Sequence, residues 1–358
     1  MAASLVKWND PGVEPHIQDE NAKINELHEI MTCVQMHNLA HHRHGFRATH
    51  VKSQAIVKGR LTVKRDLPAH LAQGLFSNDG ATYPVAIRYA NEPSFLTDDR
   101  APGPRGCGLK VFNVAGPGPF MDPTGAKTRT QDFTFNNAPI LELKDLATTV
   151  EIMGIRERNF SHPEKIEAEV RARPDKDLQL APKGLPNHHF LSYTMYSQSA
   201  YRFGENIVKY ALFPAIQSQR DLGDSASITE HSDREQHSIW LSDHFREHDA
   251  VYEFRVQLCR DLSKQSVEDA SMEWDEKQYP FETVATITFP RGQDVGSHQR
   301  RAFWDDRMAL NVWHGLEAHQ PLGSVNRLRK SLYAVSVAKR VEMNSTPIEP
   351  VSNMDQIP

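Results

Sequence analysis

The sequence predicts an α+β protein with an antiparallel β-barrel core and surrounding helices. Several short segments alternate apolar and polar residues with a period of two, and long loops rather than regular crossover helices separate them. Helical periodicity precedes the first of these segments and follows the last. The 358 residues, 39% hydrophobic and 24% charged, have an ordinary composition for a globular protein with a substantial core.

The chain begins with an irregular arm that leads into a predicted helix over residues 18–40. Its apolar residues recur at helical spacing, namely Ile24, Leu27, Met31 and Val34. We divide the chain into an N-terminal arm and helix (1–40), a barrel domain (41–343) and an irregular, Pro-rich C-terminal tail (344–358). No shift in composition is strong enough to divide the barrel domain further.

Period-two patterns predict the strands. They cover 56–63, 85–90, 109–114, 207–213, 251–258 and 283–289. In the second of these, Val85, Ile87 and Tyr89 share one face and Arg88 lies on the other. Residues 98–126 are rich in Gly and Pro and predict a loop around one short strand, and 140–182 are helical in tendency.

The last strong element is a helix over residues 324–340. Leu328, Leu332 and Val335 would form its apolar stripe, and Ser324 or Asn326 would cap its start. Arg329 and Tyr333 are four residues apart, so they share a neighbouring face.

The overall charge and the apolar segments exclude some classes of protein. A net charge of −5 argues against general nucleic-acid binding. No segment has the roughly 18–20 consecutive apolar residues needed to span a bilayer, and no signal sequence is recognisable. The three cysteines are widely spaced and form no CxxC motif, which suits a reducing compartment. We therefore expect a cytoplasmic protein, and peroxisomal import remains open.

Titratable residues are concentrated in HHRHGFRATHVK (41–52), for which a metal site, a polyanion patch and the edge of a buried catalytic site are the competing interpretations. No HExxH motif or cysteine pair supports a zinc site. The segment is too short, in an acidic chain, to favour a polyanion patch. His41 and His42 are best interpreted as solvated or interfacial residues at a helix–strand junction.

His50 differs, because it precedes the first predicted strand and can point into the mouth of a barrel. Arg47 lies three residues earlier, and Arg88, Arg105 and the Asn136–Asn137 pair follow in the next strands and loops. Several arginines and a histidine around one pocket would suit an anionic cofactor that carries carboxylates or phosphates.

Several segments together resemble the haem catalase superfamily, and in particular its small catalase-like haem proteins. The resembling segments are RATHVKSQAIVKGRLTV, VAIRYANEP, GPRGCGLKVF, QDFTFNNAPI, YRFG, VEDASMEWDEKQYPFETVATITFP and RKSLY. Each motif alone is weak, but they occur in the family's order over about residues 40–340. The resemblance implies a haem cofactor, expected to be haem b, and a barrel fold.

The resemblance also implies roles for individual residues. His50 would be the distal histidine that moves a proton between the two oxygens of a peroxide, a task suited to imidazole. Asn136 would polarise the peroxide by hydrogen bonding. Arg47 and Arg88 would lie near the haem propionates.

Tyr333 would be the proximal iron ligand, as the tyrosine of catalases is. A free phenol is neutral at pH 7 and a poor ligand, but an adjacent guanidinium and a ferric ion both favour the phenolate. Arg329, one helical turn earlier, can supply that guanidinium. Taken without the other motifs, Tyr333 would be interpreted as a tyrosine at the edge of the core.

The chain departs from the family pattern at several positions. Ser53 replaces a glycine, Ala90 replaces a serine that supports the distal histidine, and Leu141, Glu142 and Thr149 replace aromatic residues. These changes should loosen the distal histidine, open the pocket and alter peroxide selectivity.

The expected function is haem-dependent, catalase- or peroxidase-like cleavage of the O–O bond of hydrogen peroxide or an organic hydroperoxide. The alternatives are a hydroperoxide isomerase or dehydratase that resembles the allene oxide synthases, a non-catalytic haem-binding protein, and a haem-free barrel. The expected partner is the small-molecule substrate, with homo-oligomerisation suggested by the resemblance.

Overall fold

The computed structural model describes residues 4–358, so residues 1–3 of the predicted arm lie outside the described part. Nine strands form a single sheet within this range. They are β1 (Ser53–Val63), β2 (Thr82–Asn91), β3 (Arg105–Phe112), β4 (Thr130–Asn136), β5 (Met195–Tyr196), β6 (Tyr201–Phe203), β7 (Asn206–Pro214), β8 (Ala250–Leu258) and β9 (Phe281–Phe289).

The sheet closes into an antiparallel barrel. Its strand order is β5-β4-β3-β2-β1-β9-β8-β7-β6, and an additional pairing of β5 with β7 closes the ring of eight strands, leaving β6 paired outside it. Closure leaves no long unpaired edge among these strands, which removes a site of aggregation. The predicted fold class, an α+β protein with an antiparallel barrel core, is confirmed.

The barrel interior is filled by the apolar residues of the alternating patterns. Val85, Ile87 and Tyr89 of β2 all point into one large buried core cluster, together with Val57 and Leu61 of β1. Alternate residues of the same strands point outward, where a second cluster contains Ile56, Ala86, Phe112, Trp304 and Val351. The period of two in the sequence therefore corresponds to the inside and outside of the barrel.

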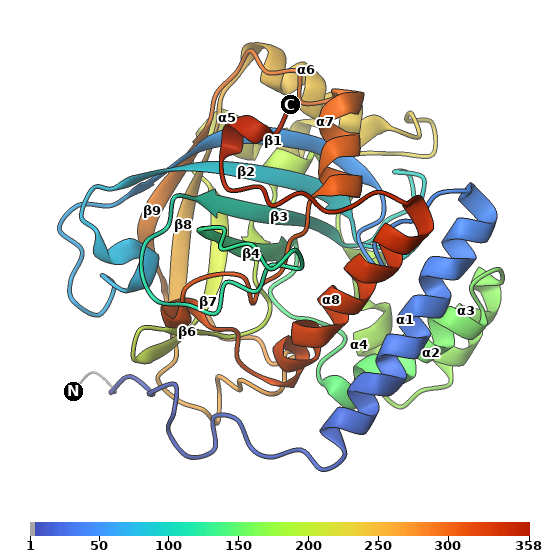
Figure 1. Ribbon diagram of the computed structural model, residues 1–358, viewed down its shortest axis with the longest axis horizontal. Helices are drawn as coiled ribbons and strands as arrows, with labels where there is room; N and C mark the ends of the chain where they lie inside the picture. Colours follow the sequence, from blue (N-terminus) through green and yellow to red (C-terminus); the bar gives the residue numbers. More distant parts are fainter. Residues whose placement is uncertain (1–3) are drawn as a thin grey trace.

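Helices surround the barrel (Figure 1). They are α1 (Glu20–His42), α2 (Leu146–Arg158), α3 (Pro163–Arg171), α4 (Lys176–Leu180), α5 (Gln217–Ser225), α6 (Gln236–Glu247), α7 (His298–Ala302) and α8 (Ser324–Asn344). Helices α1, α2 and α8 contact one another and lie side by side against one side of the barrel. No helix in residues 4–358 combines the length and apolarity needed to cross a bilayer.

Some local predictions require correction. Strand β3 begins at Arg105 rather than 109, because its Gly-rich start looked like loop, and β4 to β6 were not predicted as strands. Neither Ser324 nor Asn326 caps α8. The N-cap is Gly323 at φ 85°, and the first backbone N–H groups donate instead to carboxylates distant in sequence: Gly323 to Glu14 at 2.8 Å and Ser324 to Glu268 at 2.9 Å.

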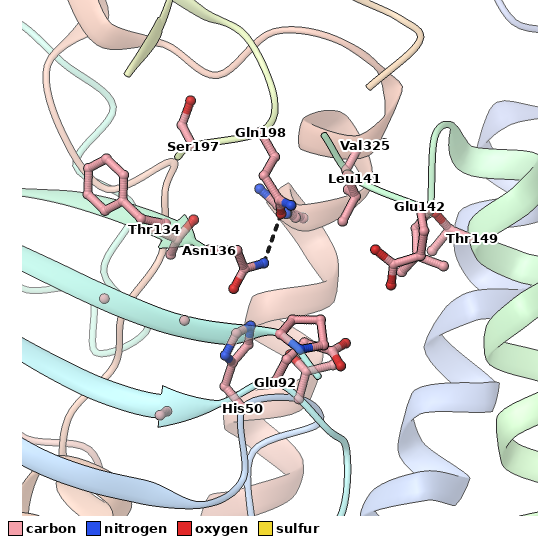
Figure 2. A pocket seen from close by; sticks show the side chains of 18 of the residues that line it. His50, Glu92, Thr134, Asn136, Leu141, Glu142, Thr149, Ser197, Gln198 and Val325 are labelled. Atoms are coloured by element: carbon pink, nitrogen blue, oxygen red, sulfur yellow. Dashed lines mark hydrogen bonds between the residues drawn. The ribbon is translucent and has the colours of Figure 1, made fainter. Parts of the chain in front are cut away.

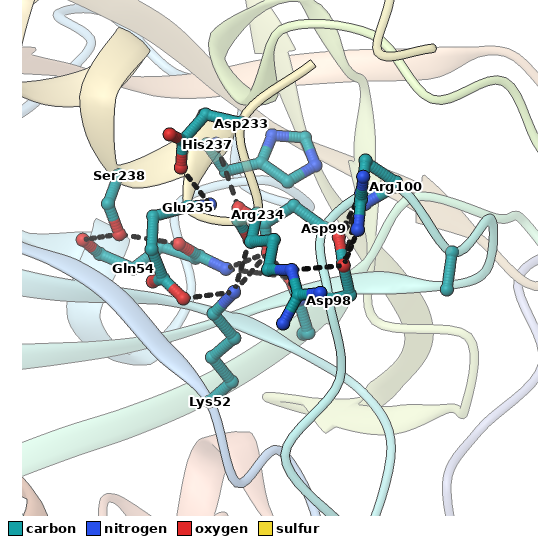
Figure 3. Close-up of polar contacts among 12 residues, drawn as sticks. Lys52, Gln54, Asp98, Asp99, Arg100, Asp233, Arg234, Glu235, His237 and Ser238 are labelled. Atoms are coloured by element: carbon teal, nitrogen blue, oxygen red, sulfur yellow. Dashed lines mark hydrogen bonds and ion pairs between the residues drawn. The ribbon is translucent and has the colours of Figure 1, made fainter. Parts of the chain in front are cut away.

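A buried polar network joins the start of the barrel to α6 (Figure 3). The Asp99 carboxylate accepts from Lys52 Nζ at 2.8 Å, from Gln54 Nε2 at 2.7 Å, from Asn91 Nδ2 at 2.9 Å and from the backbone N–H of His237 at 2.9 Å. Asp99 is fully buried. The network thus fixes the beginning of β1 and the end of β2 relative to each other, and both strand ends border the pocket described below.

Replacing Asp99 with Asn should lower the free energy of unfolding by about 3–5 kcal/mol, because it removes the buried counter-charge of Lys52 and leaves only the exposed carboxylate of Glu235, 3.0 Å away. The matched control is Asp98→Asn. Asp98 pairs with Arg100 at the surface, with 30% of its side chain exposed, so its replacement should cost less than about 1 kcal/mol. Chemical denaturation of the two variants measures the difference, and equal losses would contradict the interpretation of Asp99 as the hub.

Candidate functional site

A pocket of about 430 Å³ lies between the barrel wall and helices α1, α2 and α8. This volume lies in the range of small-molecule and cofactor sites. Most of its lining is aliphatic, and the apolar side chains include Leu27, Met31, Ile140, Leu141, Met153, Val325, Leu328 and Leu332. A few polar groups interrupt this lining, which is the usual composition of a site that binds and orients an organic group.

His50 enters the pocket from the turn that precedes β1. Its backbone is left-handed, with φ 54°, and both of its backbone polar groups are bonded. The N–H of His50 donates to the carbonyl of Glu92 at 2.9 Å, and its carbonyl accepts from Arg88 Nη2 at 2.9 Å. These two bonds hold an unusual backbone conformation that directs the imidazole inward.

Asn136, at the end of β4, lies beside His50 because Gly106 on β3 has no side chain. A Cβ atom at Gly106 would lie 2.3 Å from His50 Cε1 and 2.5 Å from Asn136 Oδ1. Gly106 pairs with Asn136 in the β3–β4 ladder. The imidazole and the amide therefore occupy the space that a side chain at position 106 would need, and Figure 2 shows His50 and Asn136 next to each other.

The Asn136 amide is held by Gln198, which lies next to β5. Asn136 Nδ2 donates to Gln198 Oε1 at 2.8 Å, and Gln198 Nε2 donates to the carbonyl of Ile140. Asn136 Oδ1 is buried and has no hydrogen-bond partner among the described residues.

Burial lowers the pKa of His50 to about 4. The carboxylate of Glu92 opposes this shift, and the guanidinium groups of Arg88 and Arg329 add to it. The imidazole is therefore neutral at physiological pH and able to accept a proton.

Arg47 and Arg88 line one end of the pocket, and the buried Arg340 lies next to them, outside the lining, beside Asp305. Arg88 Nε donates to Asp305 at 2.7 Å, and Arg47 Nη2 donates to the carbonyl of Trp304 at 2.5 Å. Arg340, two helical turns after Tyr333, donates to the carbonyls of Asp305 and Met308. Burial lowers the pKa of Arg47, and the positive charges of Arg340 and Arg88 lower it further, whereas Asp305 and Asp306 oppose the shift. The three guanidinium groups outnumber these two carboxylates, so the cluster has an excess of positive charge that an anionic group would neutralise.

Helix α8 supplies the other polar residues of the pocket. Arg329 and Tyr333 both line it, one helical turn apart. The guanidinium of Arg329 is oriented by Asn326, to whose Oδ1 it donates at 3.0 Å. Leu332 and Tyr333 are only partly buried because they face the pocket.

A pair of acidic residues lies on the wall nearest to α2. Glu92 and Glu142 share the guanidinium of Arg156, with N–O distances of 3.3 and 3.5 Å. Burial raises the pKa of Glu142, the charge of Glu92 raises it further, and Arg156 opposes the shift. Both carboxyl groups line the pocket.

The structure brings all six predicted site residues into this one pocket. They are Arg47, His50, Arg88, Asn136, Arg329 and Tyr333. Arg105 is not among them: its side chain points into the Asp99 network and bonds to His237 at 3.0 Å and Asn187 at 2.9 Å. Of the departures from the family pattern, Ala90, Leu141, Glu142 and Thr149 line the pocket.

Gly106 and Gln198 line the pocket and Arg340 lies next to it, and none of the three was predicted. Arg340 could have been predicted, since it follows Tyr333 by seven residues and so lies on the same face of α8. Gln198 carried no signal, because its position depends on the pairing of β5 with β4 and β7.

The remaining histidines of the 41–52 segment lie at the end of α1, outside the pocket lining. His41 stacks on Phe160, with ring centroids 5.8 Å apart, and His44 bonds to Asp306 at 2.9 Å. Within residues 4–358, no group of three or more His, Cys, Asp or Glu side chains is arranged to hold a metal ion.

The fold is catalase-like. A crystal structure of a fungal catalase superposes with a TM-score of 0.63 at 14% sequence identity, covering 98% of this chain and 67% of the catalase. No family model and no curated protein matches the sequence. The likeness is therefore one of three-dimensional structure.

Replacing Gly106 with Ala should displace the His50 ring and the Asn136 amide and lower the free energy of unfolding by about 1–3 kcal/mol, as overpacking does. Gly108→Ala is the matched control on the same strand. Its Cβ would meet only the flexible end of Leu310, at 3.1 Å. Crystal structures and denaturation of both variants test this, and an unmoved His50 in Gly106→Ala would contradict the shared-space interpretation.

Proposed function

We propose that this protein binds haem and cleaves the O–O bond of a hydroperoxide. The observation that supports the proposal is a single pocket that has His50 and Asn136 on its barrel side, Tyr333 and Arg329 on its α8 side, and an arginine cluster at one end. Fold likeness alone would not suffice, because one fold serves many functions.

The described residues fit a haem group. Its apolar macrocycle matches the aliphatic lining, and its two carboxylates match the guanidinium groups of Arg47 and Arg88, which line one end of the pocket. The Tyr333 oxygen, which lines the pocket one helical turn after Arg329, offers a ligand for ferric iron. When bound, haem supplies the iron chemistry of O–O bond cleavage.

His50 carries the proton transfer. Because its imidazole is buried and neutral, it can accept the proton of a hydroperoxide and return it to the departing oxygen. Arg88 and the carbonyl of Glu92 hold the backbone of His50, so that the ring needs little reorganisation during the transfer.

The pocket favours an organic hydroperoxide over hydrogen peroxide alone. Leu141 and Thr149 stand where the family carries aromatic residues, so their part of the pocket wall is aliphatic and polar rather than closed by rings. An organic substrate fits both a peroxidase and the alternative hydroperoxide isomerase or dehydratase. Consumption of a reductant distinguishes the two activities, because a peroxidase needs a reductant and an isomerase or dehydratase does not.

Haem added to the purified protein should give a ferric Soret band at one equivalent. Tyr333→Phe should weaken or shift this band, because the substitution removes the ligand oxygen and little else. The matched control is Tyr196→Phe, which lies on β5 and does not line this pocket. Titration by absorption spectroscopy measures the effect, and a wild-type protein that binds no haem would refute the proposal.

Turnover of an organic hydroperoxide should depend on His50 as a base with a low pKa. As the pH is lowered from neutrality, kcat/KM should stay level until about pH 4 and then fall, because His50 is protonated only there. His50→Ala should lose about a hundredfold or more in turnover. Stopped-flow assays, with circular dichroism to verify the fold at each pH, measure both. A midpoint near 6.5, the ordinary value for histidine, would contradict the buried, neutral state.

A further inference from the structure

A chain of amide hydrogen bonds determines which atom Asn136 presents to the pocket. The chain starts at the carbonyl of Ile140, a backbone oxygen that can only accept. Gln198 Nε2 donates to it, so Gln198 must turn its own oxygen the other way. Reversing the Gln198 amide would place two oxygens against each other in a site where Gln198 is 4% exposed.

The second amide follows from the first. Gln198 Oε1 accepts from Asn136 Nδ2 at 2.8 Å, which leaves Asn136 Oδ1 on the side of Gly106 and His50. Oδ1 is the buried atom without a partner among the described residues. Buried polar atoms are rarely left unbonded, so an unpaired acceptor that adjoins a ligand pocket indicates that a ligand donates to it.

We propose that Gln198 is a positioning residue which fixes Asn136 as a hydrogen-bond acceptor, so that the pocket selects ligands that carry a proton. This inference rests on the proposed function and extends it to specificity. A hydroperoxide can donate its O–H group to Asn136 Oδ1 as it binds, before His50 takes that same proton. An anionic ligand such as azide has only lone pairs to offer there, and the carbonyl oxygen repels it.

The orientation of the amide can be observed without haem. Neutron diffraction from the full-length, deuterium-exchanged protein distinguishes an ND₂ group from an oxygen. The expected result is ND₂ of Asn136 facing Gln198 and its oxygen facing His50. An ND₂ group that faces His50 would overturn the inference, whether or not the protein binds haem.

The consequence for ligands is tested in the haem-loaded protein with azide as the probe. Gln198→Met removes the amide and frees Asn136 to turn its NH₂ toward the pocket, so azide affinity should rise about tenfold, as expected for a hydrogen bond to a charged group. The apparent affinity for an organic hydroperoxide should not rise with it. Spectral titration of the Soret band measures azide, and KM measured separately from kcat reports the hydroperoxide.

Two further variants distinguish positioning from loss of packing. Gln257→Met removes another buried glutamine that donates to backbone carbonyls, those of Trp274 and Tyr279, at 2.8 and 2.7 Å. It should leave azide affinity unchanged. Asn136→Asp keeps an acceptor in either orientation, so adding Gln198→Met to it should have no further effect on azide. An equal rise in Gln257→Met, or an unchanged affinity in Gln198→Met, would overturn the proposal.

Discussion

The guanidinium of Arg88 links the barrel wall to two segments that form the site. It stands on the outward face of β2, is nearly buried, and bonds at once to the carbonyl of His50 and to the carboxylate of Asp305. Because arginine offers a rigid fork of donors, one side chain can orient both groups. The turn that carries His50 and the segment around Asp305, which borders α8, are thereby both anchored to β2. The positions of His50 and of α8 are therefore interdependent.

Charge is distributed unequally along the pocket, and this division gives each end a different chemistry. At one end, the guanidinium groups of Arg47, Arg88 and Arg340 outnumber the carboxylates around them. At the other end, near α2, Glu92 and Glu142 share the single guanidinium of Arg156. An anion is favoured at the first end and disfavoured at the second. A ligand with carboxylates therefore has one favourable orientation, and a second molecule that enters beside α2 would bind best if it were neutral.

The barrel strands were largely predictable, because a wall with one buried face imposes a period of two on β1, β2, β8 and β9. The short strands β5 and β6 were not, since two or three residues carry no period and are defined by their neighbours. The predicted N-cap of α8 was wrong for a related reason. Glu14 and Glu268 are distant in sequence, and only the tertiary structure brings them to the start of the helix. The predicted site residues meet in one pocket because their motifs lie at strand ends and on one helix face, where local sequence determines direction.

The orientation of an amide is the kind of property that residue identity cannot reveal. Asparagine carries a donor and an acceptor of nearly equal size, so Asn136 is compatible with stabilising either a protonated or an anionic ligand. The choice is made by Gln198 and ultimately by the backbone carbonyl of Ile140, which has no alternative role. A site can therefore keep the residue types of a familiar motif and present the opposite hydrogen-bonding group, and its specificity has to be inferred from the neighbours that hold each group in place.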